Sequence, residues 1–340
     1  MRSMTKTTQK MIFGIILTGS MLGFFWMAWS RIANEPLVRS RLMMGTIIEI
    51  TAYDRGAEAA ITAAFARMQQ IEAAIGRQEF SDLNRLAAQA GGRPLKVGDD
   101  TWQILSLAAE YWQKTDGAFD VTVNPLLELW GFGYDGEGNF PEPAAIQAAL
   151  PKVGGNKLLL FPEKREIQLV KPGMSLTVGG IAKGYAVEEA AKVLKRNGIK
   201  NAMINGGSSI KVIGDGPGGR GWRIGVENPR EAGRLVGVIV LHSGDAMGTS
   251  ADNKRFFIRD SHRYSHIIDP RTGWPAPEKM TLVTVVTRNA ATADILTKAL
   301  FLNDLNWSMR FLEQENLKAV LIDTQGKIHT TPGFQLLRQS

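Results

Sequence analysis

The order of the predicted strands and helices constrains the fold of this chain more than any other feature of its sequence. Apolar residues at three- and four-residue spacing predict a helix over residues 56–76. A further helix over 183–197 is followed by Gly198, which suits a left-handed cap. Hairpins are predicted over 157–170 and 319–330. Because hairpins and helices are mixed and do not strictly alternate, the order favours the α+β class over a doubly wound sheet.

The remaining elements are consistent with one domain. A glycine-rich loop with irregular backbone is expected over residues 130–139. Neither an internal repeat nor an interdomain linker is visible after residue 41, so a single domain is expected over residues 42–340. The sequence also predicts strands over residues 44–53, 175–178, 202–205, 209–214, 222–227, 235–242, 256–258 and 282–287, and helices over 100–115, 143–150 and 290–313.

The N-terminal segment, residues 1–30, predicts a membrane anchor or a signal peptide. No charged residue occurs between Met11 and Trp29, and a helix of that length spans roughly 28 Å, close to the thickness of a bilayer core. Basic residues precede it, which favours a cytoplasmic N-terminus and an exported body. A cleaved signal peptide is the alternative, because small residues lie near its end. We expect an inner-membrane anchor, a linker over 31–41, and a soluble domain in the periplasm or another extracytoplasmic space.

Composition excludes several functional classes. The chain contains no cysteine, so disulfides, thiolate metal sites and a cysteine nucleophile are ruled out. The net charge of +7 comes from scattered basic residues without a run of five or six like charges. We therefore expect no nucleic-acid partner, whereas an anionic ligand is compatible with this charge.

The stretch from Gly244 to Pro277 is unusually rich in polar groups for a hairpin. It contains small residues, a charged turn, an apolar strand at 256–258, and then the sequence HIIDPRTG from His266. A structural hairpin needs its turn residues but not this density of polar side chains. We interpret the stretch as the wall of a small-molecule site, with His266 as a proton acceptor near neutral pH. The alternative interpretation is a structural hairpin whose polar side chains bind no ligand.

A glycine turn, VGGIAKG, lies between a predicted strand and the start of the helix at 183–197. Glycine lets the backbone approach a ligand closely, and the free N–H groups of a helix start attract phosphate. Lys183 would add charge to a diphosphate. The alternative is a tight packing turn without a ligand, since many strand-to-helix turns are glycine-rich.

Several stretches together resemble the ApbE family of FAD:protein FMN transferases. They occur in the family's order and span residues 43–300, and their combination is more specific than any one of them. The stretches are MMGT at 43–46, GAFDVTVNPL at 117–126, GGIAKGYAVEEA at 179–190, MGTSADNKRFF at 247–257, HIIDPRTG at 266–273 and TADILTKAL at 292–300.

The resemblance implies an ApbE-like, T-fold-related domain with mixed or antiparallel sheets and packed helices. It also implies that the chain binds FAD and transfers FMN from it to a threonine or serine hydroxyl of an exported acceptor flavoprotein, releasing AMP. His266 would be the general base. Mg²⁺ would be held by the backbone near Gly180, by Asp294 and by the residue at 298. The residues that the resemblance assigns to the flavin nucleotide are Met44, Ala118, Phe119, Asp120, Thr177, Lys183 and Ile267.

The sequence departs from the family pattern at three places. Lys298 stands where the family has a threonine that binds the metal, and a charged lysine repels Mg²⁺. Thr177 replaces an aspartate that contacts the flavin nucleotide, and the sequence at 250–253 also differs. Two readings follow: Lys298 supplies positive charge in place of metal, or Mg²⁺ still binds through Asp294, the backbone near Gly180 and phosphate oxygens. The changes also motivate an alternative function, a non-catalytic FAD-binding maturation factor of an exported redox system.

Overall fold

The structure is a computed structural model that describes residues 35–76, 78–133 and 138–337. The expected anchor or signal segment at residues 1–30 lies outside these ranges. Within them, no helix combines the length and the apolar character needed to cross a membrane.

One eight-stranded sheet forms the centre of the domain, and all of its neighbouring strands pair antiparallel. Its strand order is β1-β2-β6-β7-β10-β13-β14-β15, so segments from both ends of the chain share one sheet. The α+β prediction is confirmed. The strands are β1 (Leu37–Met43), β2 (Thr46–Ala52), β6 (Ala202–Asn205), β7 (Ser209–Ile213), β10 (Ala246–Ala251), β13 (Met280–Thr287), β14 (Lys318–Asp323) and β15 (Ile328–Thr330).

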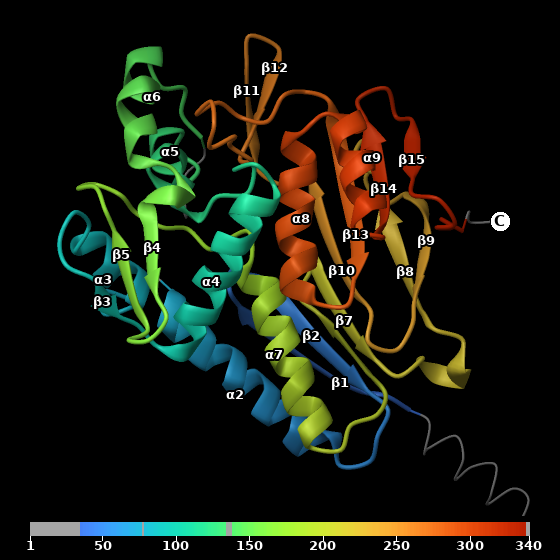
Figure 1. Ribbon diagram of the computed structural model, residues 1–340. Helices are drawn as coiled ribbons and strands as arrows, with labels where there is room; N and C mark the ends of the chain where they lie inside the picture. Colours follow the sequence, from blue (N-terminus) through green and yellow to red (C-terminus); the bar gives the residue numbers. More distant parts are fainter. Residues whose placement is uncertain (1–34, 77, 134–137, 338–340) are drawn as a thin grey trace, which may run out of the picture.

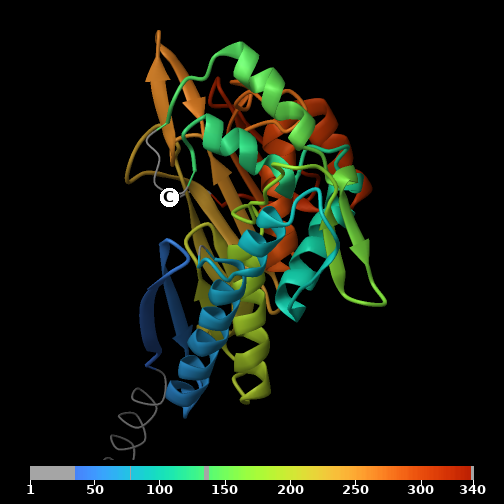
Figure 2. The same cartoon turned by 90° about the vertical axis from the view of Figure 1, so that its left-hand side faces the viewer.

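Long helices cover one face of this sheet, as the two views in Figures 1 and 2 show. The α7 helix packs on β7 and between α2 and α8, and α8 packs on β10 and β13. The apolar spacing that predicts α2 is borne out, because its repeating Ile61, Phe65 and Met68 are all buried. The helices on this side are α2 (Ala57–Ile75), α4 (Asp99–Lys114), α7 (Ala182–Arg196), α8 (Ala290–Leu302) and α9 (Leu305–Gln314).

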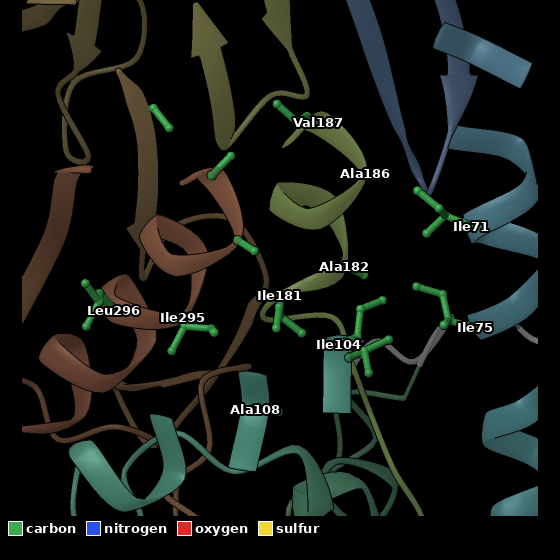
Figure 3. Packing of buried hydrophobic residues seen from close by; sticks show 14 of the residues in the cluster. Ile71, Ile75, Ile104, Ala108, Ile181, Ala182, Ala186, Val187, Ile295 and Leu296 are labelled. Atoms are coloured by element: carbon green, nitrogen blue, oxygen red, sulfur yellow. The ribbon is translucent and has the colours of Figure 1, made fainter. Parts of the chain in front are cut away.

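The main core holds the start of α7 in place (Figure 3). Ile181, directly before this helix, is fully buried in one cluster with Ile75 of α2, Ile104 of α4 and Ile295 of α8. Each fully buried isoleucine stabilises the fold by about 1.5–3 kcal/mol. Because Ile181 lies in a core shared with three other helices, the backbone of the glycine turn immediately before it is well positioned.

A smaller two-stranded sheet, β8 (Trp222–Glu227) and β9 (Leu235–Leu241), packs on the other face of the main sheet. Trp222 and Ile239 belong to a second core with residues of β7, β10, β13 and β14. The remaining elements are the strands β3 (Leu95–Lys96), β4 (Leu158–Phe161), β5 (Glu166–Leu169), β11 (Phe256–Arg259) and β12 (His262–Ser265), and the helices α3 (Asp82–Ala88), α5 (Asn124–Leu129) and α6 (Pro143–Ala149).

The structure corrects three sequence-based expectations and adds one strand. The expected helix over 290–313 is divided into α8 and α9. The expected linker at 31–41 overlaps β1, an edge strand whose exposed arginines hide its pairing with β2. The expected strand at 175–178 joins no sheet, because the Thr177 N–H donates to the carbonyl of Val121 instead. Strand β10 was missed because Gly248 and its small neighbours do not look like a strand; a Cβ at Gly248 would lie 2.7 Å from the backbone of Ala293.

Candidate functional site

The glycine turn before α7 brings three of the predicted site residues together. Within it, the N–H groups of Ile181 and Ala182 both donate to the carbonyl of Val178, at 2.9 and 2.8 Å. A Cβ on Gly180 would lie 3.0 Å from Cε2 of Phe119 and 3.7 Å from Cγ of Lys298. The Gly180 backbone therefore packs against both the Phe119 ring and the Lys298 stem.

Two lysines, Lys183 and Lys298, bring positive charge to this turn. Both side chains are partly buried, and neither ammonium forms a hydrogen bond or an ion pair with a described residue. Burial lowers the pKa of Lys298 to about 8; the Asp294 carboxylate opposes this shift and the Lys183 charge adds to it. Two ammonium groups that have no partner among the described residues favour the binding of an anion here.

His266 follows β12, and its imidazole is oriented by the backbone of Arg255, the residue directly before β11. Its Nδ1 lies 3.1 Å from the carbonyl oxygen of Arg255, which also accepts the His266 N–H at 3.0 Å. A carbonyl oxygen only accepts, so Nδ1 carries the proton and the Nε2 lone pair is left available. Burial lowers the pKa of His266 to about 4, and the charges of Lys298, Arg255 and Lys183 also lower it, against the hydrogen bond to Arg255. The imidazole is neutral at pH 7, as a general base requires.

The lowered pKa of His266 predicts a loss of stability in acid. An unfolded histidine titrates near pH 6.5, whereas His266 in the fold does so at about 4. Between these values the unfolded state binds a proton that the folded state does not, so the free energy of unfolding falls as the pH falls and levels off below about 4. We expect the wild type to lose more stability than His266→Gln between about pH 7 and about pH 4.5 in denaturant titrations. Equal losses in the two proteins would contradict the prediction.

Asp294 is almost fully buried, and its carboxylate braces three elements. One oxygen accepts the Gly184 N–H of α7 at 2.8 Å, and the other accepts the Ser209 hydroxyl of β7 at 2.6 Å. The neighbouring Thr297 accepts a hydrogen bond from Ser250 of β10 and donates to the Asp294 carbonyl, both at 2.8 Å. Its hydroxyl therefore faces the sheet and not the glycine turn.

The residues expected to hold Mg²⁺ do not form a metal site of the usual kind. Among residues 35–76, 78–133 and 138–337, no three His, Cys, Asp or Glu side chains come together to hold a metal ion. Asp294 is the one carboxylate of the predicted set, and both of its oxygens already accept hydrogen bonds. Lys298 stands one helical turn later, on the same face of α8. A magnesium site of oxygen ligands does not fit this donor set.

The GAFD segment contributes Phe119 to the site, but its carboxylate points elsewhere. Asp120 accepts the N–H and the hydroxyl of Thr122 at 2.7 and 2.6 Å, and the N–H of Gly155 at 2.7 Å. Burial raises the pKa of Asp120, against these hydrogen bonds. Ala118 is fully buried. Asp120 thus holds the loop that places Phe119, and it also lines an outer cavity of about 570 Å³.

Met44 stands at the tip of the β1–β2 hairpin in a left-handed conformation. Met44 and Gly45 have φ values of 52° and 72° and form a two-residue turn between paired Met43 and Thr46. A non-glycine residue in this region is strained. Glu72 stabilises this strained turn, because its Oε1 accepts the Met44 N–H at 2.7 Å.

Two cavities meet at Met44 and Lys183. One, of about 770 Å³, lies between the main sheet and β8. The other, of about 360 Å³, is lined by Thr177 and Gly179 and also by Glu72. Met44 and Lys183 line both cavities, so they stand at the junction.

The linings of these two cavities do not include Lys298, His266 or Ile267. Lys298 and His266 interact electrostatically with Lys183, which lines both cavities. Ile267 is buried, and its carbonyl accepts the N–H of Ala276 at 2.7 Å. Ile267 therefore anchors the His266 segment in the fold.

Loss of the Glu72 carboxylate is expected to weaken binding at this junction. Glu72→Ala leaves the Met44 N–H without its acceptor, and one such hydrogen bond is worth about 1 kcal/mol, or roughly fivefold in Kd. Glu72→Gln keeps an acceptor oxygen and is the matched control. A flavin fluorescence titration with FAD checks both variants, and equal affinities for Ala and Gln would show that the Met44 turn does not shape the site.

Comparison with known proteins decides the family. Residues 44–321 match the model of the ApbE family. This chain belongs to the ApbE family. An FAD:protein FMN transferase of Klebsiella pneumoniae is 30% identical over 273 residues, which cover 79% of this chain and 83% of that protein. An FAD:protein FMN transferase of Treponema pallidum is 28% identical over 315 residues, 87% of each chain.

Solved ApbE structures share the fold as well. The ApbE protein of Thermotoga maritima has a TM-score of 0.83 and 29% identity, and the match covers 90% of this chain and all of that one (100%). The flavin transferase ApbE of Vibrio cholerae has a TM-score of 0.80 and 27% identity, covering 88% and 98% of the two chains. The predicted family and the predicted ApbE-like fold are confirmed.

Sequence reasoning missed two residues that shape this ApbE site. Arg255 contributes its backbone carbonyl, which orients His266, and Glu72 holds the Met44 turn. The first had a detectable signal, because Arg255 and His266 directly flank the paired strands β11 and β12. The second had none, since Glu72 looks like any polar residue on the exposed side of a helix.

Proposed function

We propose that this chain is an FAD:protein FMN transferase, which moves FMN from FAD to a threonine or serine hydroxyl of an acceptor protein and releases AMP. The observation that carries the proposal is a neutral His266, with Nε2 available, within electrostatic range of Lys183 and Lys298, whose ammonium groups pair with no described residue. Transfer of FMN from a diphosphate requires a base and positively charged groups that bind the phosphates. The relatives named above carry this activity in their names.

The proposed reaction needs proton removal, by His266, and charge neutralisation, by Lys183 and Lys298. Nε2 of His266 takes the proton from the acceptor hydroxyl as its oxygen bonds to the phosphorus of the FMN half. The bond from that phosphorus to the bridging oxygen breaks, and AMP leaves with the electron pair. In the proposed arrangement, the ammonium groups of Lys183 and Lys298 balance the negative charge that develops on the leaving phosphate. No metal ion enters this sequence of steps.

The two cavities support FAD as the donor. FAD has two bulky ends joined by a diphosphate, and the structure has two cavities joined at Met44 and Lys183. In the proposed arrangement each cavity receives one end, and the diphosphate lies at the junction. The Gly179–Gly180 turn admits it because neither residue carries a side chain.

We further propose that the acceptor is an exported protein and that the N-terminal segment tethers the enzyme to the membrane that the acceptor faces. The support is the uncharged run between Met11 and Trp29, preceded by basic residues. A fusion of residues 1–41 to a reporter that is active only outside the cytoplasm tests this. Reporter activity that remains with washed membranes supports tethering, and an inactive fusion contradicts export.

The transfer reaction itself is testable without knowing the acceptor. The purified full-length chain is incubated with FAD and a membrane extract of the source cells, and the proteins are then separated under denaturing conditions. We expect fluorescent bands that carry covalent flavin, together with release of AMP. Bound FAD without covalent bands and without AMP would instead support the non-catalytic maturation factor.

A further inference from the structure

The stem of Lys298 lies along the Gly180 backbone, where the family resemblance expects a metal ion. Its Cγ lies 3.7 Å from where a Cβ of Gly180 would be, so the side chain runs along the glycine turn. Asp294 precedes it by one helical turn on the same face of α8, and the two groups interact electrostatically. A cation between the Gly180 backbone and Asp294 would therefore meet an ammonium group.

Among the residues that the structure describes, the ammonium of Lys298 lacks the partner that a buried charge usually has. Asp294 directs its oxygens to Gly184 and Ser209, and no described residue forms an ion pair with Lys298. An unpaired, partly desolvated charge destabilises the fold unless a ligand compensates it. Of the two charged side chains that act on Lys298, Asp294 is already engaged by Gly184 and Ser209, and Lys183 is also positive. The missing partner is therefore an anion.

We propose that the Lys298 ammonium binds the diphosphate of FAD in place of a divalent metal, so that this chain binds FAD and transfers FMN without a metal ion. The second half of this proposal rests on the transferase function proposed above. Lysine is a compact point charge with three donors, and it neutralises phosphate oxygens without a fixed coordination geometry. In the transfer step it pairs with the charge that builds up on the phosphate of AMP as the phosphorus–oxygen bond breaks.

The test combines three variants with FAD and riboflavin as ligands, each in EDTA and in Mg²⁺. Lys298→Met removes the charge and keeps an unbranched stem, and Lys195→Met removes the same charge from an exposed residue in the last turn of α7. Lys298→Thr places a hydroxyl one turn after Asp294. Thermal unfolding confirms that each variant folds, and fluorescence titration gives the Kd values.

We expect wild type and Lys195→Met to bind FAD equally well in EDTA and in Mg²⁺. Lys298→Met should raise the Kd for FAD about tenfold or more in EDTA and leave the Kd for riboflavin, which has no phosphate, unchanged. Lys298→Thr should bind FAD more tightly in Mg²⁺ than in EDTA. Wild-type binding that requires Mg²⁺, or a Lys298→Met protein that binds FAD as the wild type does, would overturn the proposal.

Transfer assays on the same proteins separate this proposal from the function on which it rests. If the wild type transfers FMN in EDTA and Lys298→Met does not, the result supports both the transferase function and metal independence. Transfer by the wild type only in Mg²⁺ overturns metal independence and leaves the transferase function standing. FAD binding through Lys298 without any transfer, in EDTA or in Mg²⁺, overturns the function and leaves the binding role of Lys298 standing.

Discussion

His266→Ala is expected to lower the rate of FMN transfer by about 10²–10⁴-fold, the usual contribution of a general base. The variant should still bind FAD, because the proposed role of His266 is to take a proton from the acceptor hydroxyl. The Nδ1 hydrogen bond to the Arg255 carbonyl leaves Nε2 as the atom that acts. The measurement is the rate of covalent flavin formation at saturating FAD, with the Kd for FAD determined in parallel.

His262→Ala is the matched control for this prediction. His262 lies four residues earlier, in the exposed β11–β12 hairpin, and contacts the carbonyl of Asp260. Its loss should leave both the transfer rate and the Kd for FAD unchanged. A His266→Ala protein that transfers FMN at the wild-type rate would remove the base from the proposed mechanism.

Asp294→Ala is expected to lower the free energy of unfolding by about 2–4 kcal/mol, because it removes two hydrogen bonds to a buried carboxylate. The Gly184 N–H and the Ser209 hydroxyl would lose their acceptor where α7, α8 and β7 meet. Denaturant titration in EDTA and again in Mg²⁺ measures the effect. Thr292→Ala, in the first turn of α8, is the control and should change stability little.

Comparing EDTA with Mg²⁺ distinguishes a bracing role of Asp294 from a role as a metal ligand. A residue that braces the fold lowers stability by the same amount in EDTA and in Mg²⁺ when it is removed. A residue that acts as a metal ligand lowers stability only where the metal is present. An Asp294→Ala protein as stable as the wild type in EDTA would contradict the bracing role.

Local patterns in the sequence predict the helices of this domain better than its strands. The spacing of Ile61, Phe65 and Met68 reports the buried side of α2, because packing repeats with the helix turn. Strand β10 has no such pattern, since Gly248 is needed for its close approach to α8. Strand β1 is hidden by the exposed arginines of a sheet edge.

The motifs predicted which segments come together at the glycine turn better than the roles of their side chains. Gly180, Phe119 and Lys298 do meet, as the motifs indicate. The carboxylate of Asp294 bonds to residues 110 and 85 positions away in the chain, which no local pattern reports. The shift in the pKa of His266 arises from burial and from charges on other elements, so it too depends on the tertiary structure.

The most direct test of the central claim is a crystal structure of the full chain with FAD, grown with Mg²⁺ present. We predict that the diphosphate lies over the Gly179–Gly180 turn, within hydrogen-bond distance of the ammonium groups of Lys183 and Lys298, and that Nε2 of His266 faces the phosphorus of the FMN half. A diphosphate bound away from this turn, or a magnesium ion between it and Asp294 with Lys298 turned aside, would contradict the account.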